Sequence, residues 1–245
     1  MRGTAITRLF KNMRSRAVSD YSRCILKYLE PAKNEISLLD CGCDDGEWTL
    51  RLGARVGAVR LYGIEIVDER RQAALRKGIL AEPGDLNEPF PYEDGQFEVV
   101  HANQVIEHLK DTDNFVKEIK RTLKPGGYAV ICTENLASWH NIFSLVFGWQ
   151  PFSLTNVCEK RFQIGNPLAI HYDIAPSNPQ SWQHNRVFTY RGLKEIFTVH
   201  GFVVERIEGS GYYPLPNRLS KLDPRHAAFL TLKIRNAGTT APETK

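Results

Sequence analysis

The chain has 245 residues and a formal net charge of +4, which suits one α/β domain with a sizeable insertion or cap. Its 42% hydrophobic and 24% charged residues are ordinary globular values, and no apolar run approaches the roughly 20 residues that span a bilayer. Five irregularly spaced cysteines, and a basic N-terminus with no apolar run after it, argue against a secreted protein and for a cytoplasmic one.

The charge is unevenly distributed along the chain. Residues 1–33 hold eight Lys or Arg against two acids, a net charge of +6, and residues 218–245 have a net charge of +4. The middle of the chain is therefore acidic, at −6. A basic end can meet an acidic partner, but nothing resembles a nucleic-acid-binding module, so we expect no nucleic-acid partner.

Residues 1–33 are predicted to be a basic helical region in two parts. The first part has an apolar face, and a second helix begins at Ser19 and stops at Pro31. Two interpretations of the first helix stay open: it docks on its own domain and shields the cofactor, or it attaches peripherally to an anionic membrane surface. The apolar face consists of Ile6, Leu9, Phe10, Met13 and Ala17.

A strand, a glycine loop and a helix follow. The apolar run Ile36–Leu39 predicts a buried parallel strand that ends at Asp40. Gly42 and Gly46 lie in the loop after it, and residues 47–56 have apolar side chains at helical spacing. This is the start of a nucleotide-binding α/β unit, in which the ligand lies at the carboxyl ends of the strands.

The loop is acidic, which narrows the class of ligand. It carries Asp40, Asp44 and Asp45, and it lacks both the dinucleotide-binding and the triphosphate-binding glycine patterns. Carboxylates instead suit a ligand with a cationic part, such as the sulfonium and ammonium of S-adenosylmethionine (SAM). The missing third glycine also argues against a nicotinamide oxidoreductase.

The sequence of residues 38–46, Leu-Leu-Asp-Cys-Gly-Cys-Asp-Asp-Gly, resembles motif I of class I SAM-dependent methyltransferases. Asp44 stands where the family usually has glycine, and aspartate tolerates a left-handed backbone better than most residues. Cys41 and Cys43 do not have a zinc-binding spacing and are expected to pack beneath the loop. The resemblance implies that SAM is held by Asp40, Gly42, Cys43, Asp44 and Gly46.

The second and third strands, predicted at residues 61–65 and 79–82 around a helix at 68–77, extend the resemblance. Glu65 ends the second strand, 23 residues after Gly42, where an acid can accept hydrogen bonds from both ribose hydroxyls. By resemblance, Ile66 contacts the cofactor as well, Asp85 meets the adenine amino group and Leu86 touches the adenine ring.

The fourth strand, predicted at residues 97–102, leads to the expected position of the transferred methyl group. By resemblance, Asn103 and Gln104 bind the cofactor there. A helix at residues 111–123 stops at the Pro-Gly-Gly sequence 125–127, and residues 128–133 form a fifth strand. A general base is needed only if the acceptor is a hydroxyl; His108 is our first candidate, with His140 and His184 as alternatives.

Residues 134–187 interrupt the alternation of strands and helices. This insertion is rich in aromatic residues and contains three of the four tryptophans and three histidines. A loop of this length is typical of a lid, so we expect it to cap the carboxyl ends of the strands and to line the acceptor pocket. No set of metal ligands is expected. The residues concerned are Trp139, His140, Phe143, Phe147, Trp149, Phe152, Phe162, His171, Tyr172, Trp182 and His184.

A helix at residues 189–200 and strands at 202–207 and 229–234 complete the domain, which we place at residues 34–245. The expected fold is α/β and Rossmann-like: seven strands, mostly parallel, with helices on both faces and the insertion after the fifth strand. In the resembled family the last two strands pair antiparallel at one sheet edge.

Two functions follow from these features. The first is a methyltransferase that acts on a small-molecule, sugar or lipid-linked acceptor, with O-methylation as one form. The second is a SAM-binding partner or regulatory subunit without methyl transfer, since residues 62–65, 77–79 and 84–86 and the sequence Thr-Glu-Asn-Leu-Ala-Ser-Trp-His-Asn at 133–141 also resemble MetW-type methionine-biosynthesis proteins. The sequence leaves the oligomeric state open.

Overall fold

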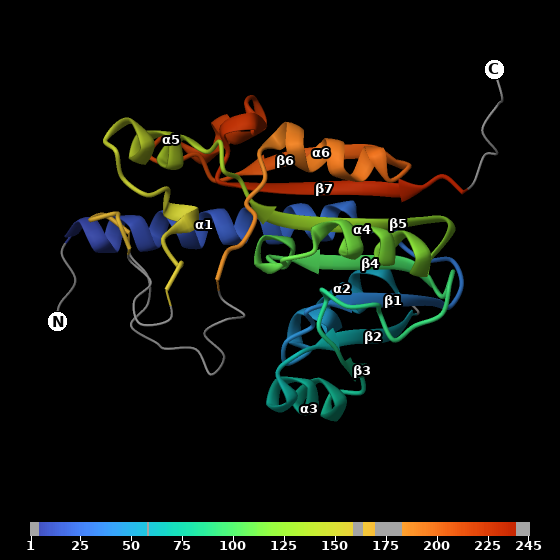
Figure 1. Ribbon diagram of the computed structural model, residues 1–245. Helices are drawn as coiled ribbons and strands as arrows, with labels where there is room; N and C mark the ends of the chain where they lie inside the picture. Colours follow the sequence, from blue (N-terminus) through green and yellow to red (C-terminus); the bar gives the residue numbers. More distant parts are fainter. Residues whose placement is uncertain (1–4, 58, 159–163, 170–182, 239–245) are drawn as a thin grey trace, which may run out of the picture.

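A computed structural model describes residues 5–57, 59–158, 164–169 and 183–238, with side chains from residue 12 onward except that of Val59. Seven strands form one sheet in the order β3-β2-β1-β4-β5-β7-β6, with β7 antiparallel to both of its neighbours and the other pairs parallel. Figure 1 shows helices on both faces of this sheet. The predicted α/β class and the antiparallel pairing at one edge are confirmed.

The predicted elements are present with small changes at their ends. The strands are β1 (Ile36–Cys41), β2 (Val59–Glu65), β3 (Leu80–Pro83), β4 (Phe97–Asn103), β5 (Leu123–Glu134), β6 (Phe202–Ser210) and β7 (Phe229–Asn236). The α-helices are α1 (Ala5–Tyr28), α2 (Glu47–Val56), α3 (Asp68–Arg76), α4 (Thr112–Thr122), α5 (Trp139–Val146) and α6 (Tyr190–Val199). Short 3₁₀ helices are η1 (Ile106–His108), η2 (Phe152–Leu154), η4 (Asn217–Lys221) and η5 (Pro224–His226).

Each face of the sheet has its own apolar core. On one face, α1 and α2 pack on β1, β4 and β5, with Ile25 and Leu52 fully buried there. On the other face, α4 and α6 bury Phe115 and Phe197 against β4, β5 and β7. Because central parallel strands are covered on both sides, they read in the sequence as short continuous apolar runs.

The N-terminal region forms one helix where we expected two. No glycine or proline separates the predicted halves, so α1 continues without a break through Ser19, whose side chain is exposed. The expected helix start at Ser19 is wrong. The buried Ala17, Tyr21 and Ile25 dock the second half of this helix on the sheet. Both interpretations of the first half stay predictions, because the side chains of Ile6, Leu9 and Phe10 lie outside the described residues. No described helix is long and apolar enough to span a membrane.

The fifth strand begins earlier than the sequence indicates. Leu123 already pairs with Phe97, the register then shifts, and Val99 pairs with Tyr128. The Pro-Gly-Gly sequence is therefore an irregularity within β5 instead of a turn before it. Gly126 has a φ of 81° there, which favours glycine.

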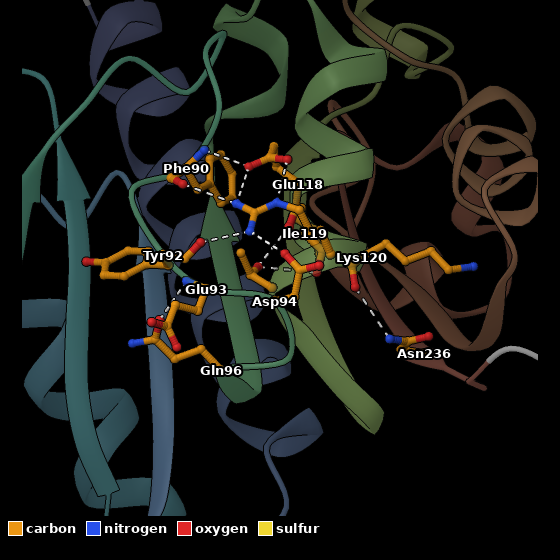
Figure 2. Close-up of polar contacts among 11 residues, drawn as sticks. Phe90, Tyr92, Glu93, Asp94, Gln96, Glu118, Ile119, Lys120 and Asn236 are labelled. Atoms are coloured by element: carbon orange, nitrogen blue, oxygen red, sulfur yellow. Dashed lines mark hydrogen bonds and ion pairs between the residues drawn. The ribbon is translucent and has the colours of Figure 1, made fainter.

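The loop between β3 and β4 is fastened to α4 by the guanidinium of Arg121. It donates to the backbone oxygens of Phe90 and Tyr92 at 3.1 and 2.8 Å, and to the carboxylates of Glu118 and Asp94. Figure 2 shows these groups converging at the end of α4. Arginine suits this position because its planar fork can serve several acceptors at once.

The described part of the insertion holds α5 and η2, and it lies at the end of the molecule where β4 and β5 finish (Figure 1). Its polar core is buried: Asn141 donates to the backbone oxygen of Asn135 at 3.0 Å and to Ser153 Oγ at 2.9 Å. The predictions for Phe162, His171, Tyr172 and Trp182 lie outside the described residues.

Candidate active site

The glycine loop after β1 uses left-handed backbone at three positions. Gly42 and Gly46 have φ values of 73° and 80°, and Asp44 has a φ of 50°. The expectation that aspartate tolerates this conformation in place of the family's glycine agrees with the structure. A Cβ on Gly42 would stand 3.0 Å from Val105 Cγ2, so glycine allows the loop to approach the segment after β4 closely.

Cys43 lies beneath the loop. Its side chain is buried in a small cluster with Ala74 and Ile79, and it packs against Gly63 of β2, where a Cβ would collide with it. Burial raises the pKa of the Cys43 thiol to about 12, so it is neutral. The structure thus gives this residue a packing role and places its sulfur under the backbone that the cofactor would contact.

The three carboxylates of the loop all have partners within the chain. The buried Asp40 accepts from Thr49 Oγ1 at 2.6 Å and lies 2.7 Å from His101 Nδ1. Trp48 Nε1 donates to His101 Nε2 at 3.4 Å, so Nδ1 carries the proton that Asp40 accepts.

The other two carboxylates are exposed at the loop surface. Asp44 lies 3.2 Å from an Arg70 guanidinium nitrogen, and Lys77 donates to Asp45 at 2.9 Å. A bonded, solvent-facing carboxylate attracts a ligand ammonium only weakly. The charge of the loop therefore does less to select a cationic ligand than we expected, and the left-handed backbone is the feature that suits a bound cofactor.

Glu65 closes the tip of β2 over the glycine loop. Its two carboxylate oxygens accept from the backbone N–H groups of Asp44 at 3.0 Å and Val67 at 2.9 Å. The side chain is nearly buried, and the following Ile66 is about half exposed (51%). A carboxylate oxygen has a second lone pair, so Glu65 can still accept from ribose hydroxyls while it orders the loop.

The remaining cofactor candidates lie after β3 and β4. Asp85 is exposed and accepts from the backbone N–H of Asn87 at 2.9 Å, whereas Leu86 is buried. Gln104 has a φ of 57°, and its N–H donates to the Cys132 oxygen at 2.8 Å. Asn103 Oδ1 is buried and has no hydrogen-bond partner among the described residues.

These residues fit SAM. The left-handed Gly42 and the unpartnered Asn103 Oδ1 lie at the carboxyl ends of the adjacent strands β1 and β4, and Glu65 lies at the end of β2 on the other side of β1. Buried polar atoms normally have partners, so an unpartnered one at a strand end indicates a ligand position. When bound, SAM would supply an electrophilic methyl group on a sulfonium.

The structure brings two of the predicted histidines together. The rings of His108, in η1, and His184, at the end of the insertion, lie edge to face with centroids 4.7 Å apart. The backbone N–H groups of Asn185 and Arg186 both donate to the backbone carbonyl oxygen of Glu107, at 2.7 and 3.2 Å. These bonds hold the insertion against η1.

A buried carboxylate completes this group, which we call the Glu–His–His cluster: Glu107, His108 and His184. Glu107 Oε2 accepts from Thr133 Oγ1 at 2.8 Å, and its Oε1 has no partner in the described part of the chain. Burial raises the pKa of Glu107 to about 7, partly opposed by His184. Burial and the neighbouring His184 lower the pKa of His108 to about 4, so this imidazole is neutral near pH 7.

His140 lies apart from the cluster. Its ring packs against Phe152 and Tyr213 with centroid distances of 5.4 and 5.2 Å, and burial lowers its pKa to about 4. An imidazole enclosed by aromatic rings is a packing residue first, so the structure favours the other two histidines as groups that meet a substrate.

Sequence reasoning missed two acids of this edge. Glu107 precedes His108 directly, and Glu134 ends β5 with Oε2 3.7 Å from His184 Nδ1. Glu134 is at the tip of a buried strand, the same signal that identified Glu65, so applying that rule to the fifth strand would have found it. Glu107 lies in η1, beyond the end of β4, and becomes visible only in the structure.

Comparisons with known proteins agree with this geometry. The family model described as a methyltransferase domain matches residues 11–207. A demethylmenaquinone methyltransferase from Lactococcus lactis is 32% identical over 125 residues, which cover 46% of this chain and 48% of the relative. Norajmaline N-methyltransferase from Rauvolfia serpentina is 29% identical over 126 residues, 48% of this chain and 42% of the relative. In both alignments the matched segment is about half of the curated relative.

A solved SAM-dependent methyltransferase from Thermotoga maritima has the same fold along nearly the whole chain. It superposes with a TM-score of 0.59 at 18% identity, covering 94% of this chain and 93% of that one. At this identity the likeness shows the fold alone. Together with the strand order, the glycine loop after β1 and the family match over most of its length, it shows that the chain belongs to the class I SAM-dependent methyltransferases.

Proposed function

We propose that this protein transfers the methyl group of SAM to a hydroxyl oxygen of a small organic acceptor. The relatives support the acceptor class, because their names give demethylmenaquinone and norajmaline as substrates, both small organic molecules. That the methylated atom is an oxygen is our own inference. It rests on the described side chains near the carboxyl end of β4.

The Glu–His–His cluster is the observation that carries the proposal. A hydroxyl must lose its proton to become a good nucleophile, whereas an uncharged amine attacks through its own lone pair. His108 is partly buried and neutral, and it lies in η1, the short helix that follows the strand ending at Asn103. The side chains of the Glu–His–His cluster can take up or orient the proton of an acceptor hydroxyl. An uncharged acceptor amine would not need such groups.

Each cofactor residue has an assigned part in this proposal. Glu65 would hold the ribose, and the loop from Asp40 to Gly46, whose Cys43 supports it from below, would hold the methionine end. Ile66, Leu86 and Asp85 would contact the adenine. Asn103 and Gln104 would lie nearest the reacting carbon, and the protein's task there is to align nucleophile, methyl and sulfur and to exclude water.

We assign the acceptor pocket to the insertion, residues 134–187. Supporting this, its described parts adjoin the cluster: His108 Nδ1 lies 3.1 Å from the Gln183 oxygen, and His184 Nδ1 lies 2.6 Å from the Ser153 oxygen. On the same segment the rings of Phe143 and Phe147 are about half exposed. Apolar rings of this kind suit an acceptor with a hydrophobic body.

Two assays test the proposal. Calorimetry should show binding of SAM and S-adenosylhomocysteine and none of NAD. The protein is then incubated with trideuteromethyl-SAM and a panel of hydroxylated ring compounds, and mass spectrometry follows the labelled methyl. We expect transfer by the wild type and by His200→Asn, a control on the far end of α6, and a loss of at least about 100-fold in Glu107→Gln. Firm SAM binding with no transfer to any acceptor would favour the alternative, a SAM-binding partner protein.

A further inference from the structure

We propose that the Glu–His–His cluster is a binding site for one divalent transition-metal ion. Glu107, His108 and His184 can each offer one ligand atom such that the three atoms all lie within 4.8 Å of one another. Two imidazoles and one carboxylate form a ligand set that suits Zn²⁺, Co²⁺, Mn²⁺ or Fe²⁺ better than Mg²⁺ or Ca²⁺, which prefer oxygen ligands.

Both imidazoles are oriented in the way that metal-binding histidines are. His184 Nδ1 lies 2.6 Å from the Ser153 backbone oxygen, and His108 Nδ1 lies 3.1 Å from the Gln183 backbone oxygen. A carbonyl oxygen can only accept, so Nδ1 carries the proton in each ring, and the lone pair is on Nε2. A backbone carbonyl that fixes the tautomer and the ring plane is the usual outer support of a histidine ligand.

The carboxylate has an oxygen to spare. Glu107 is fully buried; Oε2 is bonded to Thr133, and Oε1 has no partner in the described part of the chain. An unpartnered carboxylate oxygen in a protein interior is costly, because it has lost its water and gained nothing. A cation bound at Oε1 would restore that interaction. Glu134, 3.7 Å from His184 Nδ1, adds negative charge on the Nδ1 side of that ring.

The required adjustment is small. Ligand atoms about 2 Å from a tetrahedral ion stand roughly 3.4 Å apart, so ligand atoms up to 4.8 Å apart must approach one another by at most about 1.4 Å. The backbone on both sides of the site is tied together, since the N–H groups of Asn185 and Arg186, next to His184, donate to the backbone carbonyl oxygen of Glu107, next to His108. Rotation of the two rings about their side-chain bonds is enough to supply the change.

A metal at this site would have an open coordination position, because the described residues supply three ligands. This part of the inference rests on the proposed function: the open position could take the acceptor's hydroxyl oxygen beside the transferred methyl group. Coordination would lower the pKa of the acceptor hydroxyl, so that it would release its proton to water, and the oxygen would take the methyl group as S-adenosylhomocysteine leaves. The cluster would then activate the acceptor through the ion instead of through a free imidazole.

The test uses the full chain, stripped of metal with a chelator and dialysed. Co²⁺ is titrated in while its visible absorption is recorded, and Zn²⁺ is then added as a competitor. We expect one equivalent of Co²⁺ to give an absorption band that Zn²⁺ abolishes. Glu107→Gln, which keeps the shape of the side chain and an acceptor for Thr133, and His184→Asn should each weaken binding by at least about tenfold.

The matched control is His200→Asn. His200 is also a largely buried histidine bonded to a carboxylate, that of Asp113, but it follows α6 and is not part of the cluster. Its loss should leave Co²⁺ binding unchanged, and circular dichroism checks that all variants fold. Absence of the band, or equal binding by the wild type and both cluster variants, overturns the metal site.

The two proposals fail in different ways. Methyl transfer that persists in chelator, with no Co²⁺ bound, leaves the proposed function standing and removes the metal. Stoichiometric Co²⁺ binding that is lost in the cluster variants, with no transfer to any acceptor, supports the metal site and removes the hydroxyl methyltransferase.

Discussion

Asp44 combines a left-handed backbone, which affects the conformation of the glycine loop, with an exposed carboxylate, which could affect cofactor affinity. Its φ of 50° is tolerated by aspartate, and its side chain is 61% exposed and paired with Arg70. A surface pair of this kind contributes about 1 kcal/mol or less. The carboxylate therefore has little influence on a cofactor in the loop.

We predict that Asp44→Asn binds SAM within about threefold of wild type, because asparagine keeps the backbone conformation and loses only a screened charge. Asp44→Gly, which gives the family's usual residue, should bind at least as well. Calorimetry measures both. A tenfold loss in the asparagine variant would mean that the carboxylate faces the cofactor's ammonium after all.

Glu65 should matter far more than Asp44. It is nearly buried and is bonded to two backbone N–H groups, one of them in the glycine loop. Glu65→Ala would remove the ribose acceptor and release the loop, so we predict weaker SAM binding by about 1–3 kcal/mol, or roughly 5- to 150-fold. Glu195→Ala, a surface carboxylate on α6, is the control. Unchanged affinity in Glu65→Ala would refute the site assignment.

Among the elements, the insertion separates cofactor binding from chemistry in our proposal. Replacing residues 139–182 by a short Gly-Ser linker keeps the segment that is bonded to Glu107 and leaves the glycine loop untouched. We predict SAM affinity within about threefold of wild type and a loss of methyl transfer of at least about 100-fold, since the acceptor is no longer positioned. Cooperative thermal unfolding checks the fold. Transfer at the wild-type rate would show that the acceptor binds elsewhere.

The elements were largely predictable because local signals define them. Apolar runs and glycine positions gave the strands and the loop, and helical spacing gave α2, α4 and α6. The sequence could not predict which residues that are far apart along the chain contact each other. Asp40 and His101 are register partners on β1 and β4, so their contact becomes visible only when the sheet is assembled. The Glu107–His184 contact depends in the same way on how the insertion returns to η1.

For α1 and β5 the sequence misled us for a different reason. A serine inside α1 resembles a helix start, but packing of Tyr21 and Ile25 on the sheet outweighs one weak capping signal. The Pro-Gly-Gly sequence resembles a turn, but pairing of Leu123 with Phe97 places it within β5. In both cases tertiary contacts override a local preference.

The whole molecule should lose stability in mild acid. Burial lowers the pKa of His108 and His140 from 6.5 to about 4, so in that range the unfolded chain binds up to two more protons than the folded one. Burial raises the pKa of Glu107 from 4.5 to about 7, so the folded chain holds one extra proton there. The two histidines outweigh the one acid, and the free energy of unfolding should rise with pH by about 1.4 kcal/mol per unit between about pH 4.5 and 6.5.

Denaturant unfolding in the presence of a chelator measures this slope. His140→Phe, which suits the aromatic surroundings of that ring, should bring the slope near zero, because one histidine and one acid then offset each other. His200→Asn serves as the control. A slope in His140→Phe equal to that of the wild type would show that His140 titrates normally in the folded protein.

The central claim, transfer of the SAM methyl group to oxygen, is tested most directly by NMR of the product. The protein is incubated with SAM carrying a ¹³C-labelled methyl group and an acceptor that offers both a hydroxyl and an amine. The chemical shift of the labelled methyl then identifies the atom to which it is attached. We predict an O-methyl resonance that disappears in Glu107→Gln and persists in His200→Asn. A resonance of an N-methyl or C-methyl group, or an O-methyl resonance of equal intensity in both variants, would contradict the account.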